Sequence, residues 1–339
     1  MDFNVVVIGG GAAGLGAARS ANWEGARVAL VSDAPLGGDC TWTGCVPSKS
    51  LIEASRDGST WEQALERIED VSKRVGATED FATLRHEGVS VFEDRARFVG
   101  AKTIELTDGR RISGDHVMIA TGSRAGVPPV AGLADTPFRT NESFWEPRPL
   151  PGSMIIVGAG AIGCELGEAL ARFGTKVTLV EYGPRILGPF EPDAAALVDE
   201  NLRTLGVDVI TNARTSAISH DGARFRAELE DGTVFEADEL LVAAGRKPNT
   251  ERLGLDAAGV ATNDRGYIET DKYLRTNVKG VFAVGDINGK HMLSHAADEM
   301  GRIAAWTALR PGQRYKYDCL LYTSPSPRDA TLSRMPSSA

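Results

Sequence analysis

The chain has 339 residues, of which 42% are hydrophobic and 24% are charged, a composition typical of a globular protein with two or three domains. Its formal net charge of −9 leaves no basic surplus to follow a phosphate backbone, which excludes nucleic acid as the main partner. No apolar run approaches a membrane span, and the N-terminal MDFNVVVIGGG enters a strand-like run without a basic segment or cleavage site. We therefore expect no membrane association, no secretory leader and a reducing, cytoplasmic location.

The first predicted element is a βαβ unit at residues 8–32, and residues 157–181 repeat it without a gap. Each copy is an apolar strand, a G-x-G-x-x-G turn, an amphipathic helix and a second apolar strand, the fingerprint of dinucleotide binding. The first glycine permits the tight turn, the second lets the backbone approach a pyrophosphate, and the third lets helix and strand pack closely. One such turn can be purely structural, but two in this context predict two dinucleotide sites. The glycines are Gly9, Gly11 and Gly14 in the first copy and Gly158, Gly160 and Gly163 in the second.

The two copies differ at the last residue of the second strand. The second copy ends in Glu181, and an acid there accepts hydrogen bonds from a ribose 2′-hydroxyl and repels a 2′-phosphate, which favours NAD over NADP. Arg185, four residues on, keeps NADP open as the alternative. The first copy ends in Ser32, followed by Asp33. Either Asp33 takes the role of the acid with a shift of one residue, or Ser32 is a weaker partner and Asp33 a solvated turn residue.

The segment GGDCTWTGCVPSK at 37–49 places Cys40 and Cys45 on one short turn. A zinc site needs about four ligands, and the two other cysteines stand alone in the sequence. A disulfide across so short a loop would stabilise little by chain entropy. The pair is better suited to storing two electrons, with a helix dipole and the cation of Lys49 favouring a thiolate at Cys45.

Further stretches complete the predicted secondary structure. Residues 61–75 carry apolar side chains at helical spacing and predict an amphipathic helix packed on the core. Residues 95–123 and 223–249 alternate in polarity, and Asp-Gly pairs at 108–109 and 231–232 predict hairpin turns in them. Each nucleotide-binding unit is therefore predicted to end in a small antiparallel meander and a buried strand.

The two buried strands end in similar triplets, ATG at 120–122 and AAG at 243–245. Residues 137–151 are rich in proline and polar side chains and predict the crossing between domains. A last apolar strand leads into Asp286, and a helix over 293–309 follows it.

These motifs, in this order, resemble the class I pyridine nucleotide-disulfide oxidoreductases, a family that includes dihydrolipoyl dehydrogenase, glutathione reductase and mercuric reductase. The resemblance covers residues 4 to about 310 and is carried by GGDCTWTGCVPSK, the two fingerprints, ATGS at 120–123 and TNVKGVFAVGD at 276–286. It implies an α/β fold with two Rossmann-like, three-layer domains that bind FAD and NAD(P), each with a small antiparallel meander.

The expected FAD-binding domain has two parts, at residues 1–145 and 266–318, and the NAD(P)-binding domain lies between them at 146–265. Family members continue with a C-terminal interface domain, which we expect to be missing here. After Asp318 the sequence CLLYTSPSPRDATLSRMPSSA, residues 319–339, is identified as translated sequencing-adapter DNA, with a natural disordered tail as the alternative.

The resemblance also implies the roles of individual residues. The first fingerprint binds FAD, the second binds the nicotinamide cofactor, and Asp286 matches the acid that bonds the FAD ribitol. Lys49 and Glu165 match a Lys–Glu pair beside flavin and nicotinamide. Two electrons pass between nicotinamide, flavin and a Cys40–Cys45 redox disulfide, in which Cys45 lies on the flavin side and Cys40 exchanges with substrate.

The segment LSHAADEMG at 293–301 resembles the helix start that faces the flavin, and on physical grounds alone its His295 is as readily a capping or packing residue. No metal is expected. The residues expected to bind cofactor are Gly9, Gly11, Gly14, Asp33, Gly38, Lys49, Thr121, Gly122, Gly158, Gly160, Gly163, Glu181, Gly245, Asp286 and His295.

The expected activity is that of an FAD-dependent NAD(P)H-disulfide oxidoreductase similar to dihydrolipoyl dehydrogenase, with NAD preferred over NADP. A mercuric reductase-like enzyme, or a nucleotide-binding fragment inactive without its interface domain, stays open as the alternative. The expected partners are a small disulfide or dithiol substrate and, for the full-length protein, a second copy of the chain.

Overall fold

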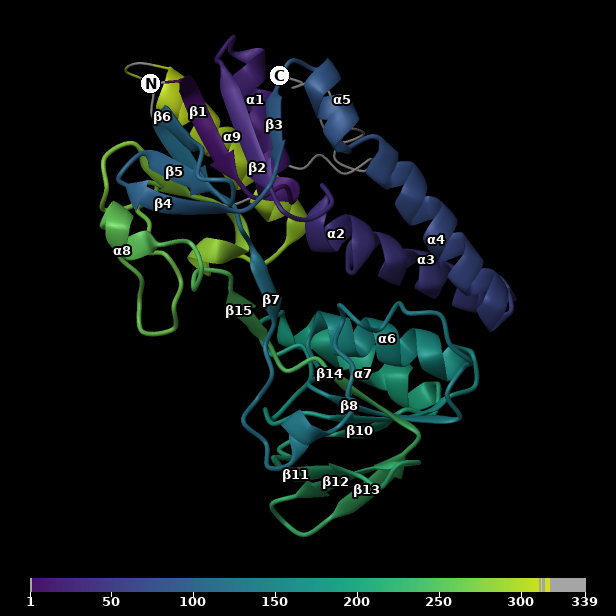
Figure 1. Ribbon diagram of the computed structural model, residues 1–339. Helices are drawn as coiled ribbons and strands as arrows, with labels where there is room; N and C mark the ends of the chain where they lie inside the picture. The colour runs from purple at the N-terminus through teal and green to yellow at the C-terminus, as the bar shows by residue number, and fades with distance from the viewer. Residues whose placement is uncertain (1, 311, 313–314, 318–339) are drawn as a thin grey trace, which may run out of the picture. The chain divides into compact units, whose positions relative to one another are not determined.

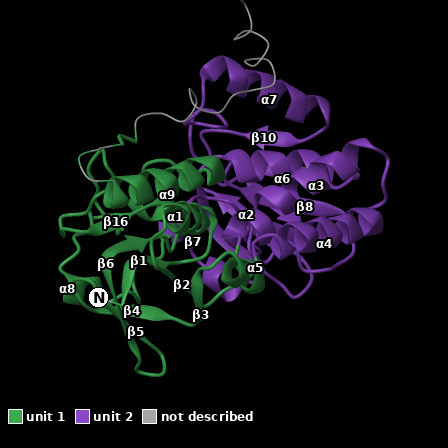
Figure 2. Cartoon of the chain, turned by 90° about the horizontal axis from the view of Figure 1, so that it is seen from above, with its two compact units in different colours: residues 1–36, 80–122, 248–339 green, residues 37–79, 123–247 purple. Residues whose placement is uncertain are grey.

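The computed structural model describes residues 2–310, 312 and 315–317, so the expected adapter-derived stretch 319–339 lies outside the described residues. The chain divides into two compact units, coloured separately in Figure 2. Unit 1 comprises Met1–Leu36, Asp80–Gly122 and the described part of Pro248–Ala339. Unit 2 comprises Gly37–Glu79 and Ser123–Lys247. Each unit has its own sheets and core.

Unit 1 is built on a mostly parallel sheet with the strand order β3-β2-β1-β6 (Figure 1). Strand β16 pairs with the other edge of β6. The strands are apolar because both faces of the sheet are covered, and the central Val5, Val6 and Val7 have no exposed surface. Ile8 pairs with Ile119, and Ile119 with Ala283, so three strands end at one level. The parallel strands are β1 (Phe3–Ile8), β2 (Val28–Ser32), β3 (Ser90–Glu93), β6 (Arg111–Ile119) and β16 (Val281–Ala283).

An antiparallel meander extends the same sheet through β4 (Ala96–Gly100), β5 (Thr103–Leu106) and β6. Its turn contains Gly109 in the left-handed region at φ 83°, which confirms the predicted Asp-Gly hairpin.

Two long helices of unit 1, α1 (Ala12–Trp23) and α9 (Ser294–Leu309), lie against one another without intervening side chains. A Cβ atom on Gly301 would stand 2.2 Å from the carbonyl oxygen of Ala13, so only glycine allows this approach. The short helices of the unit are α5 (Phe81–His86), α8 (Leu255–Ala258) and the 3₁₀ turn η2 (Gly285–Asn288).

Unit 2 repeats the design with a parallel sheet of order β10-β9-β8-β14 and a separate antiparallel meander, β11-β12-β13. Gly232, at φ 85°, lies in the turn between β12 and β13 and confirms the second predicted hairpin. The strands are β8 (Ser153–Val157), β9 (Lys176–Val180), β10 (Asp208–Ile210), β11 (Thr215–His220), β12 (Phe225–Leu229), β13 (Val234–Ala237) and β14 (Glu239–Val242).

Five helices belong to unit 2. The predicted amphipathic helix at 61–75 is confirmed as α4 and begins with a capping box between Thr60 and Gln63. Trp61 and Leu51 join the core beneath the parallel sheet, so α3 and α4 pack on the second βαβ unit. The helices are α2 (Gly38–Trp42), α3 (Cys45–Arg56), α4 (Trp61–Ala77), α6 (Ala161–Arg172) and α7 (Pro192–Thr204), with a 3₁₀ turn η1 (Leu133–Asp135).

The chain passes between the units after Leu36, Glu79, Gly122 and Lys247, and a two-stranded ribbon of β7 (Ser123–Ala125) and β15 (Arg246–Pro248) accompanies two of these passages. Residues 137–151, predicted from the sequence as the crossing between domains, are irregular but lie wholly inside unit 2. The nearest passage between the compact units follows Gly122 instead, just before β7. The α/β class with parallel sheets typical of FAD- and NAD-binding domains is confirmed. The division at residues 145 and 265 into FAD- and NAD(P)-binding domains stays a prediction, because it is defined by ligands and not by compactness.

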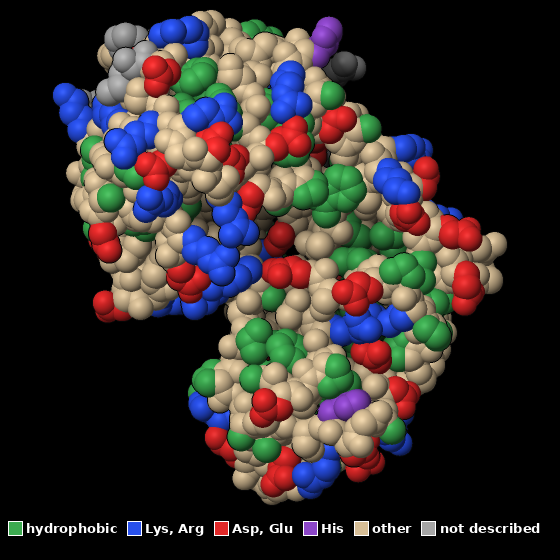
Figure 3. Space-filling view, viewed as in Figure 1, with side chains coloured by type: hydrophobic (Ala, Val, Ile, Leu, Met, Phe, Trp, Pro, Cys, Tyr) green, Lys and Arg blue, Asp and Glu red, His purple; other side chains and the backbone are tan. Residues whose placement is uncertain are grey.

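Acidic and basic side chains lie beside one another over most of the face in Figure 3. Within the described part of the chain, every helix is too short or too polar to span a bilayer.

Candidate functional site

The two predicted glycine turns have the same geometry. Gly9 and Gly158 are left-handed at φ 106° and 105°, and a Cβ atom would stand 2.3 Å from the carbonyl oxygen of Ala120 in one turn and 2.5 Å from that of Ala243 in the other. The similar triplets at 120–122 and 243–245 therefore have a structural reason: each provides the neighbouring strand end against which the first glycine packs.

The third glycines bring each helix close to its own turn. A Cβ atom would stand 1.9 Å from the Gly9 carbonyl oxygen if added to Gly14, and 2.0 Å from that of Gly158 if added to Gly163. Helices α1 and α6 therefore begin directly at the carboxyl ends of β1 and β8, as the fingerprint predicts.

The second glycines cap the helices without a side chain. Gly11 and Gly160 are the N-caps of α1 and α6, and neither helix start has a side-chain capping bond. A Cβ atom built on Gly160 meets nothing within 4 Å. Each helix thus presents backbone N–H groups at a glycine turn, and such donors suit a pyrophosphate group, for which the space beside Gly160 is open.

In unit 1 the expected FAD residues gather at the carboxyl edge of the sheet. The ends of β1, β6 and β16 are level, so Gly9, Thr121 and Asp286 all follow strands at one edge. A Cβ atom on Gly285 would stand 2.9 Å from that of Ala13, which places the chain just before Asp286 beside the start of α1. Asp286 is half-buried in η2.

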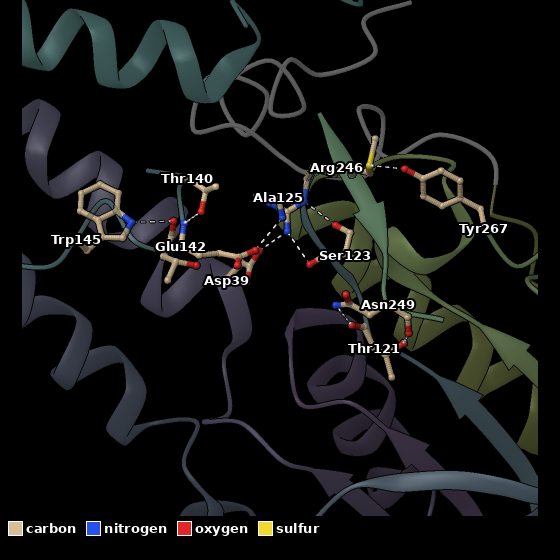
Figure 4. Close-up of polar contacts among 12 residues, drawn as sticks. Asp39, Thr121, Ser123, Ala125, Thr140, Glu142, Trp145, Arg246, Asn249 and Tyr267 are labelled. Atoms are coloured by element: carbon tan, nitrogen blue, oxygen red, sulfur yellow. Dashed lines mark hydrogen bonds and ion pairs between the residues drawn. The ribbon is translucent and has the colours of Figure 1, made fainter. Parts of the chain in front are cut away.

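Gly122 and Thr121 are held by a second segment of unit 1. The Thr121 hydroxyl donates to the carbonyl oxygen of Asn249 at 3.0 Å, and the Asn249 side-chain amide donates back to the Thr121 carbonyl oxygen at 2.9 Å (Figure 4). Gly122, at φ 65°, accepts from the backbone N–H of Asn249. Sequence reasoning missed Asn249, which lies 128 residues away in the chain.

The two alternatives for the first acid position are separated in space. Ser32 is buried, and its Oγ would stand 3.1 Å from a Cβ atom on Gly10, so Ser32 lies against the glycine turn. Asp33 is exposed, and its carboxylate accepts from Arg95 Nε at 2.6 Å. The arrangement favours the interpretation of Asp33 as a solvated turn residue.

His295 lies in the first turn of α9 and is exposed. The helix N-cap is Leu293, without a side-chain capping bond. The structure therefore assigns His295 neither a capping nor a packing role, and its expected position beside a cofactor stays a prediction.

In unit 2, Glu181 lies at the second glycine turn. Its Oε2 accepts from the backbone N–H of Ala159 and its Oε1 from that of Gly183, both at 2.7 Å. Ala159 separates the first two fingerprint glycines, so these bonds hold the carboxylate at the glycine turn, and its predicted contact with a ribose stays a prediction. Gly245, at φ 129°, follows β14 at the same edge of the sheet.

Arg185 is occupied by backbone groups of its own loop. Its guanidinium donates to the carbonyl oxygens of Leu187 at 3.1 Å, Gly188 at 2.7 Å and Phe190 at 2.8 Å. These contacts were not expected from the sequence, which left Arg185 open as a partner for a 2′-phosphate.

The two cysteines lie on consecutive helices, and both are half-buried. Cys40 is in the five-residue helix α2, and Cys45 is the first residue of α3. Gly37 and Gly38 are left-handed at φ 95° and 59°, which allows the chain to reverse just before Cys40. Cys45 is placed where the N-terminal end of a helix dipole stabilises a negative charge.

Three contacts hold the loop between the cysteines. The buried Thr41 hydroxyl donates to Glu79 at 2.9 Å, and the Trp145 indole N–H donates to the carbonyl oxygen of Thr43 at 3.0 Å. The Trp42 ring fills the space over Gly76, where a Cβ atom would stand 2.5 Å from it. The segment between the cysteines is therefore held by α4, by Glu79 just after it and by Trp145.

Lys49 and Glu165 form an ion pair between α3 and α6. Lys49 Nζ lies 2.8 and 2.9 Å from the two carboxylate oxygens, and it is one helical turn beyond Cys45. Arg56 and Glu168 form a second pair between the same helices at 2.8 Å. Together the two pairs join the cysteine helix to the helix that follows the second glycine turn.

Glu168 also accepts from Arg172 at 3.0 Å. Burial acts to raise the pKa of this carboxyl, but the hydrogen bonds from Arg56 and Arg172 outweigh it, so the pKa is lowered.

A network around Arg246 was not predicted. Its Nε donates to the Ser123 hydroxyl at 2.6 Å, and one terminal nitrogen donates both to the Ser123 carbonyl oxygen, at 2.9 Å, and to the carboxylate of Asp39 (Figure 4). Asp39 immediately precedes Cys40, and Arg246 immediately follows Gly245. Arg246 therefore connects the cysteine segment to the chain that follows β14 of the parallel sheet of unit 2.

Cys164 lies inside the second fingerprint but is not part of the redox pair. Burial raises the pKa of its thiol to about 12, so it stays protonated at neutral pH. Its Sγ contacts the carbonyl oxygen of Ala159 at 3.4 Å.

The chain is similar in sequence to known proteins. A sequence model of the Pyridine nucleotide-disulphide oxidoreductase family matches residues 3–301. Dihydrolipoyl dehydrogenase of Geobacillus stearothermophilus is 35% identical over 330 residues, covering 90% of this chain and 69% of that protein. Mercuric reductase of Staphylococcus aureus is 31% identical over 333 residues, covering 92% of this chain and 61% of that protein. The chain therefore spans less than two thirds of the length of the mercuric reductase.

The fold is also similar to a solved structure, the HOCl-induced flavoprotein disulfide reductase RclA from Escherichia coli. The TM-score is 0.86 at 31% sequence identity, with 93% of this chain and 73% of that chain covered.

Proposed function

Because the chain belongs to the pyridine nucleotide-disulphide oxidoreductase family, we propose that it is an FAD-dependent NAD(P)H-disulfide oxidoreductase that works through Cys40 and Cys45. The observation that carries the proposal is the cysteine pair on α2 and α3. The Lys49–Glu165 ion pair joins α3 to α6, the helix that begins at the second glycine turn. A nucleotide-binding protein without redox chemistry would need neither the pair nor its support.

The two glycine turns are proposed to hold the two cofactors. Gly9, Gly11 and Gly14 would receive the FAD pyrophosphate, with Asp286 on the ribitol, and the second turn would receive the nicotinamide nucleotide. FAD would supply the two-electron relay between the nicotinamide and the cysteines. The expected division into FAD-binding parts at 1–145 and 266–318 and an NAD(P)-binding part at 146–265 belongs to this proposal.

The cysteines carry out thiol–disulfide exchange. A Cys40 thiolate attacks one sulfur of the substrate disulfide, a Cys40–substrate bond forms, and the departing thiolate takes a proton. The Cys45 thiolate then attacks the Cys40 sulfur, so the second substrate thiol leaves and the Cys40–Cys45 disulfide forms. The two electrons come from the reduced nicotinamide nucleotide. In reverse, the same steps oxidise a dithiol and deliver two electrons to NAD.

NAD is proposed as the preferred nucleotide. Glu181 is fixed at the glycine turn by two backbone N–H groups, where a 2′-phosphate would meet its charge. Arg185 donates to three carbonyl oxygens of its own loop, which reduces the case for NADP.

The proposed substrate is a small disulfide or dithiol of the lipoamide type, since the NAD preference suits a dihydrolipoyl dehydrogenase-like reaction. Mercuric ion is the second candidate, because a mercuric reductase is 31% identical to this chain. A homodimer is proposed for the full-length protein by analogy with the family.

The test is to load the full-length protein with FAD and to measure NADH-dependent reduction of lipoamide and of mercuric ion. C40S and C45S variants serve as controls, because both keep the fold and remove one sulfur. The proposal requires turnover that both substitutions abolish. Undiminished turnover in both variants would show that the cysteines are not the electron carriers.

A further inference from the structure

We propose that Arg185 is a positioning residue for the nicotinamide nucleotide: it holds the loop Glu181–Phe190 against the second glycine turn, and it does not read the 2′-phosphate. The inference rests on the proposed function, because it takes the second glycine turn as the nicotinamide site. It adds a role that the fingerprint does not contain, since Arg185 lies beyond the βαβ unit.

The loop is bonded to the glycine turn at one residue. Ala159, buried between Gly158 and Gly160, donates its N–H to Glu181 at 2.7 Å and accepts from the N–H of Leu187 at 2.8 Å. Both backbone groups of Ala159 are therefore bound by the loop, one by its first residue and one by Leu187. A displacement of the loop would move the turn on which the pyrophosphate is proposed to lie.

Leu187 is the strained point of this arrangement. Its φ is +50°, in the left-handed region that disfavours residues with a Cβ atom. Its side chain packs on the core of unit 2, which explains why a leucine stands where glycine would be less strained. The backbone at Leu187 therefore needs an external contact to stay in the conformation that reaches Ala159.

Arg185 provides that contact. One guanidinium donates to the carbonyl oxygens of Leu187, Gly188 and Phe190, the residues that follow the strained φ angle. The neighbouring Ile186 is buried, so its apolar side chain fixes the loop in addition to the guanidinium. A planar fork of donors suits several carbonyl oxygens at once, which an ammonium group cannot match with the same geometry.

The same contacts commit both terminal nitrogens of Arg185 to the backbone. Three of its five N–H donors are used in this way, so turning the whole guanidinium toward a 2′-phosphate would break these bonds and release Leu187. Arg185 is therefore expected to affect NADH and NADPH by the same factor, whereas Glu181 is expected to affect them differently.

The test measures dissociation constants for NADH and NADPH by titration calorimetry on the FAD-loaded full-length protein, together with the steady-state constants. R185Q should weaken both nucleotides by a common factor of about tenfold, raising KM with little change in kcat. R185K should fall between wild type and R185Q, because lysine keeps the charge and loses the fork. E181A is the contrasting control, since it should change the ratio of the two constants.

Leu187→Gly provides the decisive comparison. Glycine adopts the left-handed conformation without strain, so the effect of R185Q should fall from about tenfold to less than about threefold in the L187G background. The thermal unfolding temperature and the FAD affinity of the double variant are measured separately. A general loss of folding can then be told apart from a specific loss of nucleotide affinity.

Two outcomes would overturn the inference. A change confined to NADPH in R185Q would show that Arg185 reads the phosphate. An equal effect of R185Q in the L187G and wild-type backgrounds would show that it does not act through Leu187. Failure of the wild-type protein to bind either nucleotide would be a different result, which overturns the proposed function and this inference with it.

Discussion

Replacing Glu181 tests the nucleotide preference directly, because the structure shows how its carboxylate is held. Both oxygens accept backbone N–H groups at 2.7 Å, from Ala159 and Gly183. The carboxylate is therefore fixed and cannot rotate away from an added phosphate. We predict that the wild-type protein uses NADH at least about tenfold better than NADPH, equivalent to ~1.4 kcal/mol.

The magnitude follows from the charges. A carboxylate and one phosphate charge about 5 Å apart repel by on the order of 3 kcal/mol at an effective dielectric constant of about 20. Solvent and salt weaken this repulsion at a half-buried site, to about half of that value. Glu181→Ala removes the repulsion from NADPH and a ribose hydrogen bond from NADH, so the preference should narrow to within about threefold.

Glu181→Gln is not a neutral replacement here. Because both carboxylate oxygens accept N–H groups, the amide NH₂ of glutamine would face the N–H of either Ala159 or Gly183. A donor left facing a donor costs about 1–3 kcal/mol, so the glutamine variant should lose affinity for both nucleotides. Both variants disturb the loop, because alanine removes both acceptors and glutamine removes one. The effect of the charge is therefore read from the ratio of the NADH and NADPH constants in each variant, and the effect of the loop from the loss that the two nucleotides share.

The assay compares kcat/KM for NADH and NADPH at one ionic strength on the FAD-loaded protein, for the wild type and both variants. Comparable kcat/KM for the two nucleotides in the wild type would refute the reasoning. So would an alanine variant that keeps the full preference, since the discrimination would then lie elsewhere.

Three other measurements test the site and one tests the sequence. Cys45→Ser should retain FAD but lose the long-wavelength thiolate-to-flavin absorption that appears when the protein takes up two electrons. Cys40→Ser should keep a Cys45 thiolate and that band while losing disulfide turnover, and wild-type turnover in both variants would contradict the assignment of the cysteines. Alkylation of the reduced protein at pH 8 should label Cys40 and Cys45 but not Cys164, because burial raises the pKa of the Cys164 thiol to about 12. Peptide mass analysis reads the labelling of each cysteine. Labelling of Cys164 at a rate similar to the other two would contradict its burial. Because the pKa of Glu168 is lowered in the folded protein, its ionised carboxylate stabilises the fold at neutral pH. This contribution to the free energy of unfolding is lost as the pH falls through the lowered pKa. Thermal unfolding of E168Q should therefore lie below wild type at pH 7 and approach it in acid, and an equal difference at both pH values would rule this out. Sequencing the gene from source DNA past codon 318 should replace the adapter-like frame with a longer one, and finding that frame followed by a genuine stop would show that the tail is real.

The sequence by itself determined the features that depend on local backbone chemistry. Gly9 and Gly158 adopt left-handed conformations that other residues disfavour, so their spacing in a βαβ context was sufficient to predict both turns. The hairpins at Gly109 and Gly232 follow the same logic, and helix α4 is visible in its apolar period and its capping box. Each signal lies within a few residues of the structure that it specifies.

Only the tertiary structure decided which distant side chains meet. Asp39 and Arg246 are 207 residues apart, and neither belongs to a pattern that names the other. Ser32 and Asp33 are neighbours in the sequence. Which of them lies against the first glycine turn depends on how the chain leaves the end of β2. The loop of Arg185 is similar, because its carbonyl partners become available only when Leu187 takes a strained conformation. Periodicity and turn chemistry report on a residue and its near neighbours, whereas such contacts depend on how whole helices and strands pack, which no single segment of the sequence encodes.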